Sequence, residues 1–211
     1  MKIVLISDTH CQLNRVNIPD GDLLIHCGDA TNQGSIQEII QFNEHLGMIE
    51  NKFEYGIVVT PGNHDFLAEK NPGLYRSMIT NAQVRIHEPI KFGELNFFLS
   101  PFSPEFCNWA FNVKRGTAIK RYWDQIPNDT NVLITHGPPH NFLDLCPDGF
   151  KAGCKDLFNR ILELEHLELH AFGHIHHQGG QMINFNGVTF VNAAVCDERY
   201  KPTNSAVVID L

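Results

Sequence analysis

The feature that most constrains this fold is a set of short apolar runs, each ending in a polar turn that carries reactive side chains. Five such runs are present, and carboxylates, imidazoles and one amide follow them. Aliphatic and β-branched runs of this length, bounded by Gly, Pro or Asp, are typical of buried strands. We therefore expect strands at residues 2–6, 22–26, 55–59, 131–135 and 167–172.

The turn after residues 55–59 shows the pattern most clearly. Pro61 and Gly62 end the strand and redirect the chain. Asn63, His64 and Asp65 then follow at the carboxyl end of the strand, the edge at which open α/β sheets bind ligands. Taken alone, this turn could equally be an ordinary polar loop, so the other strand ends must decide.

Helices are predicted between several of these strands. Ser35 and Glu38 form a capping box for a helix from Ser35 to Leu46, with Ile36, Ile39 and Ile40 on one face and Gly47 as the stop. A second amphipathic helix is expected over residues 155–165, with its apolar residues inward, and a short helix over 117–125. The inward residues of the second helix are Leu157, Ile161 and Leu164.

Two hairpins and a long loop complete the pattern. Gly93-Glu94 joins strands at 90–92 and 95–99, Asn186-Gly187 joins strands at 182–185 and 188–191, and a last strand covers 206–209. Residues 100–116 are rich in Pro and aromatics without a clear period, so we expect a long loop that covers something. The alternation of strands and helices favours an α/β fold. No repeat or linker divides it, which predicts a single domain over residues 1–211.

Composition excludes several classes of function. The 211 residues are 43% hydrophobic and 19% charged, and their net charge of −8 includes no basic run. Binding to duplex nucleic acid or to an anionic membrane is therefore not expected. If an anionic substrate binds, bound metal is the expected source of attraction.

The cellular compartment is predicted from signals and cysteines. No secretory signal or membrane-spanning run is visible, so we expect a cytoplasmic protein. The six cysteines are dispersed and form no CxxC pair, which favours reduced thiols over disulfides. Cys11 and Cys27 lie near the polar strand ends and remain alternative thiolate ligands, although Asp and His residues already fill that role.

Together, the polar strand ends predict a metal centre. Each motif alone is more often a turn, but their recurrence after five strands argues for a common site. The carboxyl ends of parallel strands meet at one edge, and oxygen and imidazole donors in this number suit two divalent transition ions. The candidate residues are Asp8, His10, Asp29, Asn63, His64, His136, His174 and His176.

These motifs also resemble a known family. Asp8-x-His10, Gly28-Asp29, Gly62-Asn63-His64-Asp65, Thr135-His136-Gly137 and Gly173-His174-x-His176 together resemble the calcineurin-like metallophosphoesterase superfamily. Two further segments, Ser100–Asn112 and Asn192–Tyr200, are similar to a subgroup, the brain-type metallophosphoesterase-domain proteins placed with class III phosphodiesterases.

The resemblance implies a fold and a set of metal ligands. The fold would be two β-sheets packed face to face with helices outside, a four-layer α/β/β/α sandwich. One metal would be held by Asp8, His10 and His176, and the other by Asn63, His136 and His174, with Asp29 bridging. The ions could be Mn, Fe, Zn, Co or Ni, with Mn favoured.

The expected activity is hydrolysis of a small phosphodiester, with cyclic nucleotides as the substrate that the subgroup suggests. A hydroxide shared by the two metals would attack phosphorus, His64 would protonate or stabilise the leaving oxygen, and Asp65 would fix the imidazole of His64. Lys114-Arg115 could reach a phosphate and His177 could line the pocket, although a surface position is the simpler interpretation of each.

Two alternatives stay open at this point. Related protein phosphatases place an Arg after the bridging Asp and a Glu after Asn-His; this chain has Ala30 to Gly34 without Arg, and Asp65. The missing cation favours a diester over a phosphomonoester, but a monoesterase or nucleotidase remains the nearest rival. A non-catalytic metal-binding scaffold is the alternative of another class. The sequence does not define an oligomeric state.

Overall fold

The apolar runs form the central strands of two sheets, as the computed structural model of residues 1–211 shows. The first sheet has the order β13-β1-β2-β3-β4. Its strands are β1 (Lys2–Ile6), β2 (Leu23–His26), β3 (Ile57–Val59), β4 (Gln83–Val84) and β13 (Val207–Asp210). The second sheet has the order β11-β12-β10-β9-β6-β5. Its strands are β5 (Glu88–Phe92), β6 (Leu95–Ser100), β9 (Val132–Thr135), β10 (Leu169–Phe172), β11 (Met182–Phe185) and β12 (Val188–Asn192).

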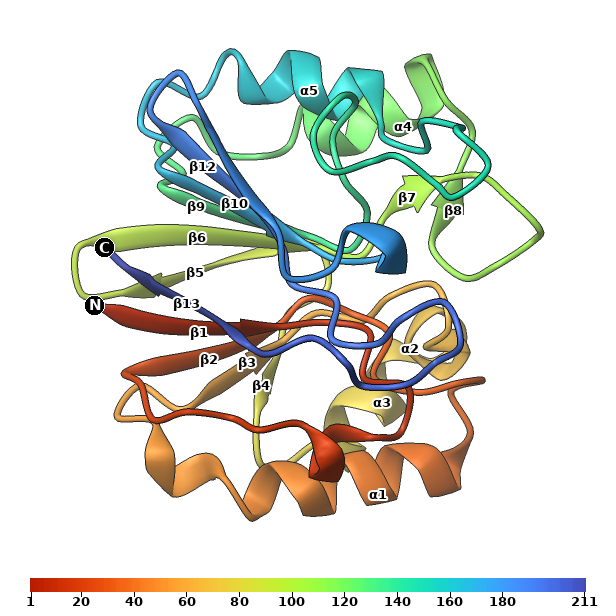
Figure 1. The fold of residues 1–211 in the computed structure, drawn as a ribbon, viewed down its shortest axis with the longest axis vertical. Helices are drawn as coiled ribbons and strands as arrows, with labels where there is room; N and C mark the ends of the chain where they lie inside the picture. The colour runs from red at the N-terminus through yellow and green to blue at the C-terminus, as the bar shows by residue number, and fades with distance from the viewer.

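Helices cover the outer face of each sheet. In Figure 1, α1 (Ile36–Gly47), α2 (Phe66–Lys70) and α3 (Pro72–Met78) lie below the first sheet, and α4 (Thr117–Trp123) and α5 (Lys155–Ile161) lie above the second. Short 3-10 turns occur at Leu13–Arg15, Glu50–Lys52 and His176–Gln178, and β7 (Ser103–Pro104) pairs with β8 (Asn112–Val113). None of these helices is long and apolar enough to cross a bilayer.

Side-chain alternation along the strands builds the four layers. Val4 and Ile6 of β1 pack in the core between the first sheet and α1, whereas Ile3 and Leu5 face the second sheet. A third core joins the second sheet to α4 and α5 around Trp123. Both faces of each central strand are thus buried, which explains why these runs are continuously apolar. The two-sheet sandwich implied by the family resemblance is confirmed.

The expectation for the inward face of α1 was partly wrong. The capping box is present, since Glu38 N–H donates to Ser35 Oγ and Ser35 N–H donates to Glu38 Oε2. However, the buried residues are Ile39, Phe42 and Leu46, while 57% of Ile36 and 39% of Ile40 are exposed. Residues 39, 42 and 46 recur at the helical period and define the inward face, so Ile36 and Ile40 lie to one side of it.

Most other predicted elements are confirmed; the helices are shorter than predicted, and the strands of the first hairpin are longer. Both hairpins and the helices at 117–123 and 155–161 are present. The pattern missed α2 and α3, because the Asn71-Pro72-Gly73 sequence interrupts any helical period and leaves two short helices. The loop expected at 100–116 contains the small β7–β8 pair.

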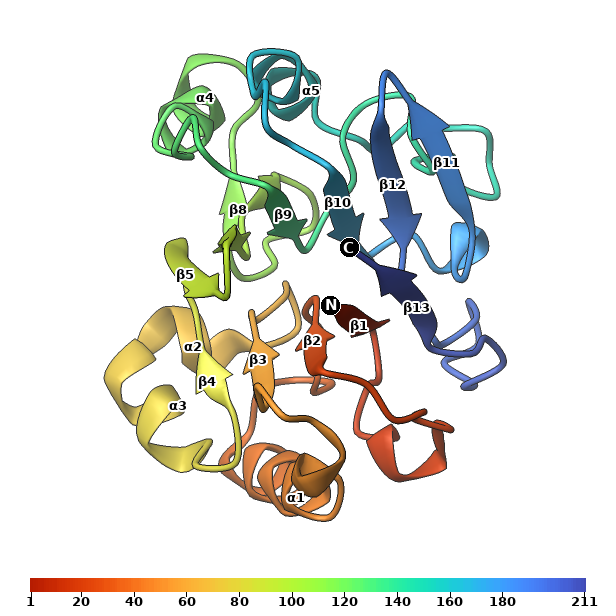
Figure 2. The same cartoon turned by 90° about the vertical axis from the view of Figure 1, so that its left-hand side faces the viewer.

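The strand directions place the functional loops on one side of the molecule. β1, β2 and β3 run parallel, and so do β6, β9, β10 and β12. Their carboxyl ends point to the right in Figure 1, while both termini lie at the left; Figure 2 shows the two sheets from the side of the termini. The strand pattern alone suggested one sheet edge, but the polar ends divide between the edges of two facing sheets.

A buried histidine makes stability dependent on pH. His170 of β10 is fully buried and its Nε2 lies 2.9 Å from Thr135 Oγ1, while burial lowers its pKa to about 3 from 6.5. In the unfolded chain the imidazole takes up a proton below pH 6.5, but in the folded chain it does not until pH 3. We therefore expect the metal-stripped protein to lose about 2 kcal/mol of unfolding free energy through His170 between pH 7.5 and 5.

Urea unfolding of the wild type and of His170→Gln at both pH values measures this effect. The glutamine can keep the hydrogen bond to Thr135 without titrating, so the variant should show the flatter pH dependence. The exposed His166→Gln should behave as wild type. Equal pH dependence of His170→Gln and wild type would contradict the prediction.

Candidate metal centre

The loops that leave five strands bring the predicted site residues together between the two sheets. Asp8 and His10 follow β1, Asp29 follows β2, and Asn63 and His64 follow β3; His136 follows β9, and His174 and His176 follow β10. Their donor atoms form three overlapping groups, within each of which the atoms lie within 4.8 Å of one another. The groups are Asp8–His10–His176, His10–Asp29–His64 and Asp29–His136–His174.

Contacts between the two sheets define the geometry. His176 Nε2 lies 3.2 Å from Asp8 Oδ1 and 3.3 Å from His10 Nε2. His136 Nε2 lies 3.3 Å from Asp29 Oδ2 and 2.8 Å from Asn63 Oδ1. Asp29 Oδ2 therefore stands between the two ends of the site, consistent with the bridging position implied by the resemblance.

The local backbone is unusual at these positions. Asp8, His10, Asp29 and His174 have φ angles of 54°, 41°, 56° and 69°, in the left-handed region that non-glycine residues seldom adopt. Such conformations persist only where the surrounding structure enforces them, and they cluster at functional sites. Here they turn successive side chains out of the strand direction and into the space between the sheets.

Hydrogen bonds from the outer ring nitrogens fix the orientation of two imidazoles. His136 Nδ1 lies 3.1 Å from the carbonyl oxygen of Cys27, and His176 Nδ1 lies 2.9 Å from that of Asp197. A carbonyl oxygen only accepts, so both Nδ1 atoms carry the hydrogen. In the neutral ring, the Nε2 lone pair then points into the site, as in metal-ligating histidines.

Burial and mutual charge set the protonation of the site. Burial disfavours the ionised forms of Asp8 and Asp29, but His176 beside Asp8 and His136 beside Asp29 hold the pKa of each carboxyl below its usual value. Burial alone would lower the pKa of His136, yet the charge of Asp29 raises it to about 9. Burial lowers the pKa of His174 to about 3. Asp8 and Asp29 are therefore ionised, and their negative charges attract cations to the site.

The donors fit divalent metal ions. His136 Nε2 lies 2.8 Å from Asn63 Oδ1 and, because its pKa is raised, donates a proton to that oxygen in the metal-free chain; the Nε2 atoms of His10 and His176 face each other at 3.3 Å. A bound cation would take the place of the His136 proton and would accept the lone pairs of these atoms. Because the ligands are carboxylate, amide and imidazole without thiolate, the set suits a dinuclear centre of divalent transition ions. All six cysteines are free, and no group that could hold a metal includes Cys11 or Cys27.

His64 occupies a different position from the inward ligands. Its Nδ1 lies 2.8 Å from the carbonyl oxygen of Asn32, so Nδ1 donates and Nε2 faces the site, 3.9 Å from Asp29 Oδ2. The Trp109 ring stacks on the imidazole at 4.2 Å between centroids. These two contacts leave the Nε2 atom free to meet a substrate.

The expected role of Asp65 was wrong. Its carboxylate is fully buried and accepts hydrogen bonds from the backbone N–H groups of Thr31 and Gly62 and from the Thr31 hydroxyl, at 2.7–3.1 Å. It makes no contact with the imidazole of His64; the carbonyl of Asn32 fixes that ring instead. Asp65 lies behind the site because the residue begins α2, where the chain turns inward. It braces the loops that carry Asp29 and Asn63.

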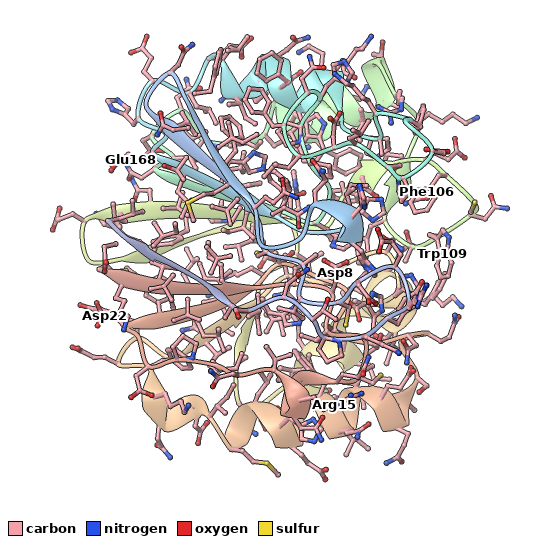
Figure 3. The ribbon with its side chains drawn as sticks, viewed as in Figure 1. Asp8, Arg15, Asp22, Phe106, Trp109 and Glu168 are labelled. Atoms are coloured by element: carbon pink, nitrogen blue, oxygen red, sulfur yellow. The ribbon has the colours of Figure 1, made fainter.

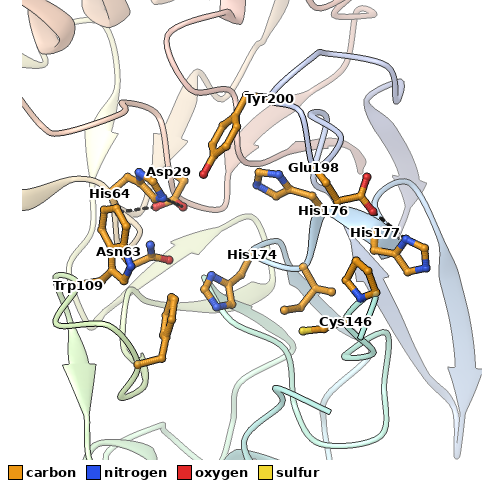
Figure 4. Close-up of a pocket in the computed structure, with 13 residues that line it drawn as sticks. Asp29, Asn63, His64, Trp109, Cys146, His174, His176, His177, Glu198 and Tyr200 are labelled. Atoms are coloured by element: carbon orange, nitrogen blue, oxygen red, sulfur yellow. Dashed lines mark hydrogen bonds and ion pairs between the residues drawn. The ribbon is translucent and has the colours of Figure 1, made fainter. Parts of the chain in front are cut away.

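The site opens to solvent through a pocket of about 280 Å³ (Figure 4). Phe106 and Trp109 of the 100–116 loop line the pocket, and Figure 3 shows both at the right of the molecule, the side to which the strand ends point. Cys146, Glu198 and Tyr200 also line the pocket but were not predicted. They lie on loops away from the strand ends, where the sequence pattern that identified the other residues is absent. The only sequence signal was that Trp109 and Tyr200 lie within the two subgroup-like segments.

Of the three further candidates His177, Lys114 and Arg115, only the histidine lies in the pocket. His177 does line the pocket, where its Nδ1 lies 2.8 Å from Glu198 Oε1. Lys114 and Arg115 do not line it; Arg115 instead donates to the carbonyl oxygens of Gly153 and Ala152. No Lys or Arg lines the pocket. Any attraction of an anion into the pocket must therefore come from the centre itself.

Comparison with known proteins places this geometry in a family. The family model described as calcineurin-like phosphoesterase matches residues 1–178. The chain is 36% identical to metallophosphoesterase domain-containing protein 1 of Homo sapiens, over all of this chain and 71% of that protein. It is 37% identical to UPF0046 protein K07C11.7 of Caenorhabditis elegans, over 94% of this chain and 71% of that protein.

Among solved structures, the fold is similar to that of phosphopantetheinyl hydrolase (PptH) from Mycobacterium tuberculosis. The TM-score is 0.60 and the sequence identity 14%, over 99% of this chain and 96% of that one. At this identity the likeness concerns the fold alone. The family match and the two relatives confirm the expected superfamily and its brain-type subgroup.

Two metal ions per chain are expected. Metal-stripped protein dialysed against Mn²⁺ should retain about two equivalents by elemental analysis. Asp29→Ala should lower this number because its carboxylate serves both ends of the site, whereas the exposed surface variant Glu54→Gln should leave it unchanged. Retention of two ions by Asp29→Ala would refute a bridging role for that carboxylate.

The turn at Gly173 is expected to tolerate no side chain. A Cβ atom there would overlap Asp8 Oδ2 and the Ser7 side chain, beside the hydrogen bond that His174 N–H donates to Asp8 at 2.9 Å. Gly173→Ala should therefore reduce Mn²⁺ affinity at least about 10-fold by displacing Asp8 and His174 together. Gly73→Ala, at a position without a positive φ where a Cβ would meet only Asn71 Oδ1 at an ordinary 3.7 Å, is the control. Calorimetric titration with Mn²⁺ measures both.

Proposed function

The chain belongs to the calcineurin-like phosphoesterase family, and from this premise we propose that it is a metal-dependent phosphodiesterase acting on small substrates. The observation that carries the proposal is a dinuclear ligand set at the base of a pocket without any Lys or Arg. A phosphodiester carries one negative charge, whereas a phosphomonoester is largely a dianion near neutral pH. The centre alone can attract the first, but the second would gain from cationic side chains that this pocket lacks.

The residues divide into ligands and a proton donor. Asp8, His10 and His176 would hold one ion, Asn63, His136 and His174 the other, and Asp29 both. When bound, such ions polarise the phosphoryl group and activate the attacking water near neutral pH. Mn²⁺ is the ion that we propose, since the nitrogen and oxygen donors accept it.

His64 would assist departure of the leaving group. Its Nδ1–H donates to the Asn32 carbonyl, which directs Nε2 into the pocket. A protonated Nε2 can deliver its proton to the leaving oxygen as the phosphorus–oxygen bond breaks. Trp109 holds the ring in plane from the solvent side and restricts its rotation. A positioned acid of this kind contributes most when the leaving group is a poor one.

Hydrolysis of paired nitrophenyl esters tests the function. Protein reconstituted with Mn²⁺ should hydrolyse the diester with at least about 10-fold higher kcat/KM than the matching monoester, because only the diester suits the charge of the pocket. Asp29→Ala should abolish turnover, and the exposed His166→Ala should leave it unchanged. Preference for the monoester would favour a phosphatase or nucleotidase. No turnover with two ions bound would favour a non-catalytic scaffold.

The leaving group tests the role of His64. We expect His64→Ala to lower kcat about 100-fold for a diester with an alkyl leaving group. The loss should be much smaller for a nitrophenyl leaving group, since nitrophenolate departs without protonation. Equal losses for both substrates would show that His64 acts by another means, such as holding a metal ion through the His10–Asp29–His64 group.

A further inference from the structure

Tyr200 stands over the centre without a structural explanation for its hydroxyl group. Its ring centroid lies 4.6 Å from that of His10 and 5.4 Å from that of His176, both in edge-to-face geometry. In Figure 4 the hydroxyl oxygen of Tyr200 points into the pocket, toward Asp29. The ring therefore packs on ligands, while its polar end faces the space that a substrate would occupy.

The hydroxyl has no hydrogen-bond partner within the protein. The main-chain carbonyl of Tyr200 accepts from the Gln12 side chain, but the phenol oxygen contacts no donor or acceptor. By contrast, the neighbouring pocket residues His177 and Glu198 are paired with each other. Ring packing would be served equally by phenylalanine, and because 45% of Tyr200 is exposed, its hydroxyl is available to a ligand in the pocket.

The backbone is constrained in order to present this side chain. Tyr200 has a φ of 56°, a conformation that costs free energy in a bulky residue and that the surrounding turn must enforce. Asp197 supplies that turn: its carboxylate accepts from the N–H groups of Arg199 and Lys201 at 2.9 Å, and its carbonyl accepts from Tyr200 N–H. The same carbonyl orients His176. One turn therefore positions both a metal ligand and Tyr200.

Donors are scarce in this pocket, which gives the hydroxyl its chemical value. No Lys or Arg lines it, and His64, whose ring centroid lies 6.2 Å from that of Tyr200, serves the leaving oxygen in the proposed function. The Tyr200 hydroxyl is then a donor available to a non-bridging oxygen of a phosphoryl group at the centre. A tyrosine hydroxyl ordinarily keeps its proton at neutral pH, so it can donate to that oxygen.

We propose that the Tyr200 hydroxyl is a catalytic hydrogen-bond donor to a non-bridging phosphoryl oxygen, next to His64, whose ring centroid lies 6.2 Å from that of Tyr200. The inference rests on the proposed phosphoesterase function and deepens it. Negative charge grows on the non-bridging oxygens when water attacks phosphorus, so a donor fixed there stabilises the transition state more than the ground state. Tyr200 thereby takes over part of the task that a cationic side chain would perform.

Tyr200→Phe tests the proposal because it keeps the ring and removes only the oxygen. Removal of one such donor should lower diester kcat at least about 10-fold. The Mn²⁺ content should stay that of the wild type, since phenylalanine still packs on His10 and His176. Tyr55→Phe is the matched control: Tyr55 is also partly exposed, but it packs on Phe92 away from the site, so its kcat should remain within about twofold of wild type.

Binding of inorganic phosphate separates this inference from the proposed function. Calorimetry of the Mn²⁺-loaded proteins should show phosphate binding to the wild type and about 5-fold or more weaker binding to Tyr200→Phe. That result would support the inference even if neither ester were hydrolysed and the proposed function failed. Wild-type phosphate affinity and diester turnover in Tyr200→Phe would overturn the inference while leaving the function intact. Absence of phosphate binding to the wild type would also overturn it.

Discussion

The contacts of two buried carboxylates across the gap between the sheets are the interaction on which the rest of this structure depends. Asp8, on the first sheet, accepts from the backbone N–H of His174 and contacts His176, both on the second. Asp29, also on the first sheet, contacts His136 on the second. Two buried carboxylates without positive charge nearby would carry a large desolvation penalty. The imidazoles relieve part of it, and divalent ions would relieve the rest.

The surroundings of these carboxylates are closely packed. An apolar layer fills the space between the sheets, and backbone hydrogen bonds join the loops that leave the strand ends. Asp65, buried behind these loops, ties the turn of Asp29 to the turn of Asn63 through backbone N–H groups. Burial raises the pKa of the Asp65 carboxyl to about 6, which shows that burial of its charge costs free energy that the hydrogen bonds from the loops must offset. A precise ligand set needs such support around it.

The outer part of the pocket is lined mainly by aromatic side chains rather than by ligand-type groups. Phe106, Trp109 and Tyr200 reach the centre from two loops far apart in sequence, and they bring aromatic surface and a single hydroxyl but no positive charge. Glu198, the acidic side chain of the outer wall, is paired with His177. A pocket of this composition would leave the attraction of a phosphate group to the centre and would use its walls for the organic part of the proposed substrate. Selectivity among phosphoesters would therefore be decided by net charge first and by shape second.

The sequence by itself determined the strands, the metal-ligand candidates and the family, because each ligand follows a buried apolar run whose pattern is local. Asp8, Asp29 and His136 could be found in this way, and the capping box of α1 likewise depends on neighbouring residues only. The tertiary structure alone decided that the strand ends divide between two sheets, that Asn32 rather than Asp65 orients His64, and that Tyr200 stands over the centre. These features arise from contacts between segments that are remote in the chain or from the direction in which a turn sends a side chain. Neither remote contacts nor turn directions produce a periodic pattern in the sequence.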